Sequence, residues 1–353
     1  MDISERIFSL KVLGVRLKEL SGAISDENNL ELSRLLVDIR DRNPWFTPTS
    51  IQQSLSAWSL ALTEEGIERW VGHYPEIHQS LSVKVGVINA GNIPLVGLHD
   101  LLSVFITGNT YIGKNATEDP FLLPWIIREW VTLVPGIERC FSFVDKLSGM
   151  ERVIATGSNN SARYFEYYFG KYPNIIRKNR HAVAIIDGSE SIDELVELGR
   201  DIFTYYGLGC RNVAKIYVPD KYDFKDFFES IYRFHEVMNH HKYMNNFDYN
   251  NSVYLLKQIP FLQNNFLILK EDEAISSPLA VLFFEYYSTE NTLIQKLEER
   301  QEELQCVAVN DRLKYRLSEN VVQIPIVNMG ATQFPSLMDY ADGVDTVRFL
   351  LNR

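Results

Sequence analysis

The strongest constraint on the fold is an alternation that begins at residue 83. Short apolar runs rich in β-branched residues are separated by stretches of helical periodicity; the runs are residues 83–88, “RVIAT”, “HAVAII” and “VAKIYVP”. A strand that is joined to the next strand through a helix pairs with it in parallel, because a parallel neighbour needs a long crossover connection. The alternation therefore predicts an α/β fold with parallel sheet in two units.

The first 75 residues lack this alternation and are predicted to be helical. Apolar side chains recur at helical spacings in “RIFSLKVLGVRLKEL” and “NNLELSRLLVDIRDRNPWF”, and Pro44 is expected to end the second helix. Ser191 is the predicted N-cap of the helix in “SIDELVELGRDIFTYYG”. Two polar segments are assigned from their composition: “HEVMNHHKYMNNFDYNNS” as a helix end and loop, and “LIQKLEERQEELQ” as a charged, solvated helix.

The charge and the cysteine content of the chain limit its expected binding partners and the cellular compartment in which it is expected. The 353 residues carry 35 basic and 46 acidic side chains, a net charge of −11 without a long basic run, so nucleic acid is not an expected partner. No apolar run approaches the roughly 18 residues of a membrane span, and the N-terminus has no signal-peptide pattern. Three cysteines are too few for a disulfide framework and favour a reducing compartment. A cytoplasmic protein is expected.

One of the three cysteines has an unusual context. Cys210 follows two glycines in “YYGLGCRN”, precedes Arg211, and lies at the mouth of a turn. A cysteine in a tight turn beside a cation is a candidate nucleophile, because only the thiolate attacks. The alternative is a half-buried cysteine at a strand edge, which is a common role for this residue. The local pattern leaves both open, whereas Cys140 and Cys306 lie in segments without such features.

Two turns are candidates for ligand binding. In “ATGSNNSARYF” a strand leads through Gly157 and Ser158 into a helix, and the N–H groups at that helix start would face a phosphate. The full G-x-G-x-x-G fingerprint is absent. In “NAGNIPLVG”, Asn89 and Asn92 flank a turn. An asparagine amide donates well to an oxyanion, but asparagine is also an ordinary turn residue, so each motif is weak by itself.

Two other kinds of site are not expected. His240 and His241 follow His235 by five and six positions, whereas metal ligands on one helix face are three or four positions apart. The sequence also has no H-E-x-x-H and no C-x-x-C motif. A G-x-S-x-G elbow is absent as well, which argues against a serine hydrolase.

In their order along the chain, these motifs resemble those of the aldehyde dehydrogenase superfamily, and more closely those of the LuxC-type acyl-CoA reductases, which reduce fatty acyl thioesters. The resemblance covers about residues 80–353. It rests on “GNIPLVGLHDLLSVFITGNTYIGK”, “VIATGS”, “YYGLGCRNVAKIYVP” and “FPSLMDYADGVDTVRFLL”, the first of which contains Asn92-Ile93-Pro94, Gly108-Asn109-Thr110 and Lys114.

The resemblance implies an aldehyde dehydrogenase-like fold of two Rossmann-like units, with the active site in the cleft between them, and a nicotinamide cofactor. Cys210 would carry the thioester intermediate. Asn92 and the backbone N–H of Cys210 would form the oxyanion hole. Gly157 and Ser158 would lie near the cofactor pyrophosphate, and Lys114 would reach the adenosine ribose or its phosphate.

Departures from the superfamily pattern refine the implied activity. Hydrolytic aldehyde dehydrogenases carry a glutamate before the strand that corresponds to “HAVAII”; here “RKNRH” contains no acid, and Arg177 falls near that position. That glutamate activates water, so its absence favours an acyl-thioester reductase over an acid-forming dehydrogenase. Thr117 stands where a ribose-binding glutamate is common, which favours NADPH, although Glu118 is adjacent and NADH stays an alternative. The Glu-x-Phe-Gly-Pro motif is reduced to “EAISSP”.

The implied function is reduction of an acyl-CoA or acyl-carrier thioester to an aldehyde through an acyl-cysteine. Three alternatives stay open: an acyltransferase that forms the acyl-cysteine without reduction, an NAD-dependent aldehyde dehydrogenase, and a non-catalytic subunit. A homo-oligomer is expected. The predicted domains are residues 1–190 with the N-terminal helices and the cofactor site, residues 191–325 with the nucleophile, and a return segment of residues 326–353.

Overall fold

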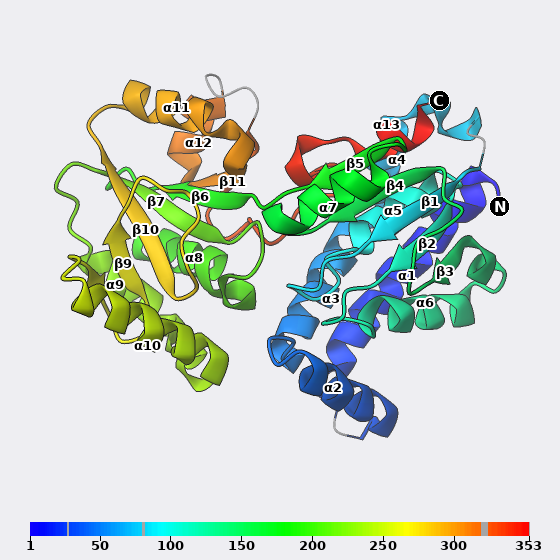
Figure 1. Ribbon diagram of the computed structural model, residues 1–353, viewed down its shortest axis with the longest axis horizontal. Helices are drawn as coiled ribbons and strands as arrows, with labels where there is room; N and C mark the ends of the chain where they lie inside the picture. Colours follow the sequence, from blue (N-terminus) through cyan, green and yellow to red (C-terminus); the bar gives the residue numbers. More distant parts are fainter. Residues whose placement is uncertain (27, 80–81, 319–323, 353) are drawn as a thin grey trace. The chain divides into compact units, whose positions relative to one another are not determined.

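The predicted α/β fold with parallel sheets in two units is confirmed in the computed structural model, which describes residues 1–26, 28–79, 82–318 and 324–352 (Figure 1). Unit 1 comprises Met1–Asn179 and Phe334–Arg353, and unit 2 comprises Arg180–Gln333. Unit 2 thus begins before the predicted boundary at residue 190, because strand β6 (His181–Ile185) pairs with β7 and β11 of the unit 2 sheet.

Unit 1 is built on a five-stranded parallel sheet in the order β3-β2-β1-β4-β5. Its strands are β1 (Lys84–Ile88), β2 (Thr110–Lys114), β3 (Phe141–Phe143), β4 (Arg152–Thr156) and β5 (Asn174–Arg177). On either side of the central β1, Ile88 is in register with Lys114 and with Ala155. The order of the strands reverses between β1 and β4, and this reversal is where open α/β sheets bind ligands outside the carboxyl ends of the strands.

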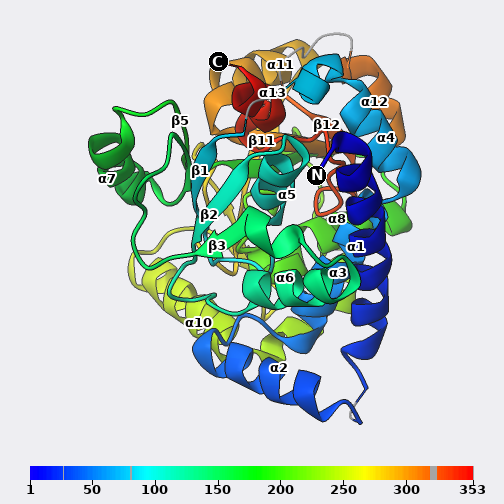
Figure 2. The same ribbon diagram turned by 90° about the vertical axis from the view of Figure 1, so that its right-hand side faces the viewer.

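The helices of unit 1 include those predicted in the first 75 residues. They are α1 (Ile3–Ala23), α2 (Leu30–Arg42), α3 (Pro48–Ala61), α4 (Glu64–Gly72), α5 (Leu98–Ile106), α6 (Leu122–Leu133), α7 (Asn159–Phe169) and α13 (Thr346–Leu351). Helix α2 ends just before Pro44, as expected. Helix α1 packs along α3, and the last helix, α13, packs against α5 (Figure 2).

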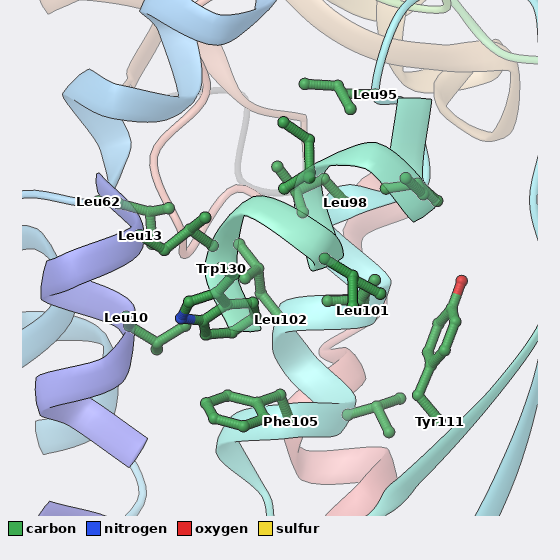
Figure 3. Close-up of a cluster of buried hydrophobic side chains, with 14 of the residues drawn as sticks. Leu10, Leu13, Leu62, Leu95, Leu98, Leu101, Leu102, Phe105, Tyr111 and Trp130 are labelled. Atoms are coloured by element: carbon green, nitrogen blue, oxygen red, sulfur yellow. The ribbon is translucent and has the colours of Figure 1, made fainter. Parts of the chain in front are cut away.

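The core of unit 1 forms where α5 is covered by other helices. Leu102 and Phe105 of α5 lie beside Leu10 of α1 and Trp130 of α6, all essentially excluded from solvent (Figure 3). The Trp130 indole N–H donates to the backbone oxygen of Ser9 at 3.0 Å. Because nearly every residue of α5 is buried, this helix holds the loop after β1 in a fixed position.

Unit 2 is built on a seven-stranded sheet in the order β12-β11-β6-β7-β10-β9-β8. All neighbouring strands are parallel except β8 and β9. Besides β6, the strands are β7 (Val213–Pro219), β8 (Leu262–Gln263), β9 (Ile268–Glu271), β10 (Val281–Tyr287), β11 (Leu304–Val309) and β12 (Ile326–Asn328). The helices are α8 (Ile192–Phe203), α9 (Lys225–Ile231), α10 (His241–Leu256), α11 (Glu290–Glu299) and α12 (Asp311–Ser318).

The local predictions in unit 2 had different outcomes. Ser191 caps α8 in a capping box with Glu194, which confirms the predicted N-cap. The segment “HEVMNHHKYMNNFDYNNS” was expected to be a helix end and loop, but the 3₁₀ helix Tyr232–Asn239 and α10 make it mostly helical. Burial overrides the weak helix propensity of its asparagines; the buried positions of α10 are Tyr243, Phe247, Asn250 and Tyr254.

The charged segment “LIQKLEERQEELQ” is only partly the solvated helix that was expected. Helix α11 ends at Glu299, and Leu304 and Gln305 already belong to the fully buried strand β11. Cys306, in the middle of β11, is therefore a core residue. In the part of the chain that the structure describes, no helix combines the length and apolarity needed to cross a membrane.

Candidate active site

Three of the sequence-predicted segments lie at the carboxyl edge of the unit 1 sheet. The “GNIP” turn with Asn92 follows β1, Lys114 is the last residue of β2, and Gly157 and Ser158 follow β4. Parallel strands in register end at the same edge, so the fold brings these segments to the point where the strand order reverses.

The two asparagines of the “NAGNIP” loop have different environments. Asn89 is buried, and its Nδ2 donates to the hydroxyl of Tyr111 at 2.8 Å and to Oδ1 of Asn115 at 2.9 Å. This side chain therefore ties the loop after β1 to β2 and to the loop that follows β2. Asn92 is exposed on unit 1, so of the two it is the one whose side chain is accessible to a substrate.

A cation that the sequence did not reveal lies at the loop after β2. Nε of Arg42, at the end of α2, donates to the backbone oxygen of Thr117 at 2.6 Å. Thr117 and Glu118 are both exposed. No local motif connects Arg42 with this loop, because the two are 75 positions apart in the chain. The loop after Lys114 therefore has a second basic group beside it.

The turn after β4 is shaped by close packing of α7. A Cβ atom on Gly157 would lie 2.8 Å from Cε2 of Phe165 and 2.9 Å from Cβ of Ser161, so only glycine lets α7 begin this close to the strand. The hydroxyl oxygen of Ser158 caps α7 by accepting from the N–H of Ser161 at 3.2 Å. The start of α7, at this edge of the sheet, suits a pyrophosphate.

Arg177 stands near the position where hydrolytic relatives carry a glutamate, and it lies inside unit 1. At the end of β5, its guanidinium forms a two-pronged ion pair with Asp100 of α5, and both side chains are at most 7% exposed. It also donates to the hydroxyl of Thr346 in α13 at 3.0 Å. The pair connects the sheet, α5 and α13, so this position supplies a structural cation and no base.

Cys210 lies in unit 2, on a strained turn just before β7. Tyr205, Tyr206 and Gly207 are three consecutive residues in the left-handed region, with φ angles of 52°, 57° and 80°. For the two tyrosines this conformation costs roughly 1–2 kcal/mol per residue. Such a turn persists only where its surroundings fix it, and strain of this kind clusters at functional sites.

Aromatic packing fixes one side of the turn. The ring of Tyr206 lies 4.4 Å from the ring of His240 and 6.3 Å from that of Tyr243, measured between centroids. His240 is the N-cap of α10 and Tyr243 lies in its first turn, in the segment that was expected to be a helix end and loop. Tyr205 is itself buried.

Hydrogen bonds from Asn212 fix the other side. Its Oδ1 accepts from the N–H of Gly209 at 2.8 Å. Its Nδ2 donates to three backbone oxygens at the end of α8, those of Asp201 at 3.0 Å, Ile202 at 3.3 Å and Thr204 at 2.7 Å. Asn212 is only 2% exposed. Nothing in the local sequence marked this residue, because its contacts are visible only in the folded turn.

A cavity opens beside the turn within unit 2. It has an empty volume of about 390 Å³, part of it continuous with solvent, and Tyr206 and Gly207 contribute to its wall. Ser277 and Pro278, from the “EAISSP” segment, also line it. His181 is the imidazole in the lining; burial lowers its pKa, opposed by the nearby carboxylate of Glu303, so the ring is neutral at neutral pH.

The other two cysteines are less suited to attack a substrate. Cys306 is buried in β11. Cys140 is half-buried, and this burial raises the pKa of its thiol, which disfavours the thiolate. None of the three cysteines forms a disulfide. Within residues 1–26, 28–79, 82–318 and 324–352, no three His, Cys, Asp or Glu side chains are grouped as a metal site would require.

Two parallel-sheet units of this kind define the aldehyde dehydrogenase-like fold. Aldehyde dehydrogenase 21 from Physcomitrella patens, solved with succinate, matches with a TM-score of 0.67 and 12% identity over 99% of this chain and 84% of that one. An oxidoreductase from Marinobacter aquaeolei matches with a TM-score of 0.66 and 12% identity, over 95% and 79% of the two chains.

An NADP-dependent enzyme from E. coli also has this fold, with a TM-score of 0.62 and 14% identity over 94% of this chain and 78% of that one. The sequence itself matches no protein-family model and no curated protein. At these identities the likeness establishes the fold, and the chemistry has to be argued from the residues of this chain.

Proposed function

We propose that the protein is a nicotinamide-dependent oxidoreductase that reduces an acyl thioester to an aldehyde, as the LuxC-type acyl-CoA reductases do. The observation that carries this proposal is the fixed, strained turn before Cys210, since such turns present nucleophiles. The aldehyde dehydrogenase-like fold supports the class of reaction. The buried pair of Arg177 with Asp100 supports reduction over hydrolysis, because no general base comes from that position.

In the proposed acylation step, the Cys210 thiolate attacks the carbonyl carbon of the thioester. The new carbon–sulfur bond places a negative charge on the carbonyl oxygen, which the Cys210 N–H and the Asn92 amide are proposed to stabilise. Collapse of this tetrahedral species breaks the bond to the donor thiol. The departing thiolate takes up one proton, which balances the proton that the Cys210 thiol lost, and an acyl-cysteine is left.

The reduction step needs a hydride donor. The carboxyl edge of the unit 1 sheet fits a dinucleotide, because the start of α7 after Gly157 faces that edge and Lys114 ends the neighbouring β2. When bound, a nicotinamide dinucleotide, for which we propose NADPH, would supply the hydride that converts the acyl-cysteine to the anion of a thiohemiacetal. As the oxyanion of this species re-forms the carbonyl, the carbon–sulfur bond breaks, which releases the aldehyde and restores the Cys210 thiolate.

Mass spectrometry of the intact protein tests the proposal directly. The wild type is incubated with acetyl-, octanoyl- and hexadecanoyl-coenzyme A, and we expect the mass of one acyl group to appear. Cys210→Ala should abolish this adduct, while Cys140→Ala and Cys306→Ala should retain it. Acylation that persists in Cys210→Ala would show that the nucleophile is a different residue.

Adding NADPH to the acylated protein separates the alternatives. A reductase oxidises NADPH and releases one aldehyde per acyl group. An acyltransferase becomes acylated but leaves NADPH unchanged. An aldehyde dehydrogenase instead reduces NAD when an aldehyde is supplied and releases a carboxylic acid, and a non-catalytic subunit does neither.

A further inference from the structure

We propose that Asn212 is a positioning residue, which holds the backbone that presents Cys210 to the substrate. This inference rests on the proposed function for its catalytic consequence. Asn212 forms hydrogen bonds with both backbone polar groups of Gly209. Its Oδ1 accepts from the N–H of Gly209 at 2.8 Å, and its own N–H donates to the backbone oxygen of Gly209 at 3.0 Å. The residue immediately before the nucleophile is thereby fixed.

The same side chain anchors the turn to α8. The last carbonyl groups of a helix have no partner within the helix, and Nδ2 of Asn212 donates to three of those at the end of α8. The left-handed residues Tyr205 and Tyr206 lie between these carbonyls and Gly209. Asn212 therefore closes a loop around the strained segment and opposes its relaxation.

The backbone of Asn212 also fixes the turn to the sheet. Its carbonyl oxygen accepts from the N–H of Ala182 in β6 at 3.3 Å, and Ala182 pairs with Val213 in the sheet. Asn212 thus connects three parts of unit 2: the end of α8, the turn and the first residues of two neighbouring strands. A shift of the thiol by about 1 Å, which loss of this connection would permit, can cost a reaction about 100-fold.

An amide is the one common side chain that suits this position. Aspartate would accept from Gly209 but would place a negative charge against three carbonyl oxygens. Leucine has a similar shape and makes no hydrogen bond, which would leave buried polar groups unsatisfied. The geometry also assigns the N–H of Gly209 to Asn212, so Gly209 is not an oxyanion donor.

Asn310 provides a matched control in the same unit. It is also 2% exposed, accepts from the N–H of Leu313 at 2.8 Å and donates to Oε1 of Glu190 at 2.8 Å. It follows β11, whereas Cys210 precedes β7, and these strands run parallel on either side of β6, so the two residues lie at opposite edges of the sheet. Asn310→Ala therefore removes a comparable buried amide away from the turn.

The first experiment measures acylation by octanoyl-coenzyme A through the thiol that it releases. We expect Asn212→Ala to lower the maximal acylation rate about 100-fold while the half-saturating thioester concentration changes less than about two-fold, because binding contacts are retained. Asn310→Ala should keep the wild-type rate although it unfolds at a lower urea concentration. Equal rates in Asn212→Ala and the wild type, or an equal loss in Asn310→Ala, overturn the proposal.

A second experiment does not depend on the proposed reaction. Alkylation of Cys210 by iodoacetamide, followed on its peptide by mass spectrometry, reports how the turn presents the thiol in the cofactor-free protein. We expect its rate constant in Asn212→Ala to move toward that of the urea-unfolded chain, and an unchanged rate constant overturns the positioning role. If Asn212→Ala does not fold, Asn212→Ser takes its place, since serine keeps one donor. Persistent acylation in Cys210→Ala would refute the proposed function alone.

Discussion

The carboxylate of Asp201 holds the segment that leads out of unit 2, because both the N–H and the hydroxyl of Thr332 donate to its Oδ1, at 3.1 and 2.7 Å. Its Oδ2 accepts from the N–H of Gly330 at 2.7 Å. Asp201 is fully buried, and this burial raises the pKa of its carboxyl from 3.8 to about 6, against the opposing effect of the three hydrogen bonds. Its backbone oxygen is one of the three that accept a hydrogen bond from Nδ2 of Asn212.

This raised pKa makes the stability of the protein depend on pH. The fold binds the Asp201 proton more tightly than the unfolded chain does, so the stabilisation is complete below about pH 4 and is lost as pH rises through about 6. We expect the free energy of unfolding of the wild type, relative to Asp201→Asn, to fall by about 3 kcal/mol between about pH 4 and pH 7. Urea denaturation at both pH values measures this difference.

Asp119 is also buried with a pKa raised to about 6, but it is present in both proteins and its contribution cancels in the comparison. If the wild type and Asp201→Asn change in parallel with pH, the Asp201 carboxyl is not the titrating group.

The buried pair of Arg177 and Asp100 predicts a large loss of stability when one partner is removed. Arg177→Met leaves an unpaired carboxylate inside unit 1, and we expect it to lower the free energy of unfolding by about 3–5 kcal/mol. The double variant Arg177→Met/Asp100→Leu should recover most of this loss, since no charge is then buried alone. Chemical denaturation of the wild type and of these two variants measures both effects. A single variant as stable as the wild type contradicts the structural role.

Substitution by alanine is expected to have different effects at Asn92 and at Asn89. Asn92→Ala should lower the rate of acylation of Cys210 by roughly 10²–10³, the usual effect of losing one oxyanion donor, with little change in stability because the side chain is exposed. Asn89→Ala should instead destabilise the fold by about 1–3 kcal/mol, because it leaves Tyr111 and Asn115 without a buried partner. Near-normal acylation in Asn92→Ala would reduce this residue to a turn former.

Cofactor preference is predicted from the loop after Lys114. Thr117 and the adjacent Arg42 favour a 2′-phosphate, and a charge-assisted hydrogen bond to it contributes on the order of 1.5–3 kcal/mol. We expect NADP⁺ to bind tens-fold more tightly than NAD⁺ by calorimetry, and Thr117→Glu or Arg42→Ala to reduce the difference. Arg40→Ala, on the same helix, is the control. Equal affinities that none of these variants alters would show that the ribose is recognised elsewhere, with Glu118 the first residue to test.

Local sequence predicted several of the strands and helices correctly, because their physical basis is local. The β-branched runs became β1, β4, β6 and β7, and the serine before α8 became its N-cap. The errors lie where long-range burial overrides local preference: the asparagine-rich α10 is held in place by aromatic side chains that face the interior, and the charged α11 gives way to a buried strand.

By itself the sequence determined the fold class and the order of the motifs, and it singled out Cys210 and Asn92, because short-range periodicity and turn composition are written along the chain. The tertiary structure alone decided which distant groups meet. It joined Arg177 to Asp100 across 77 positions and placed Arg42 beside Thr117. It also placed three backbone oxygens within hydrogen-bonding distance of Nδ2 of Asn212. A hydrogen bond or an ion pair depends on distance in space, and that distance is fixed only when the helices and strands pack.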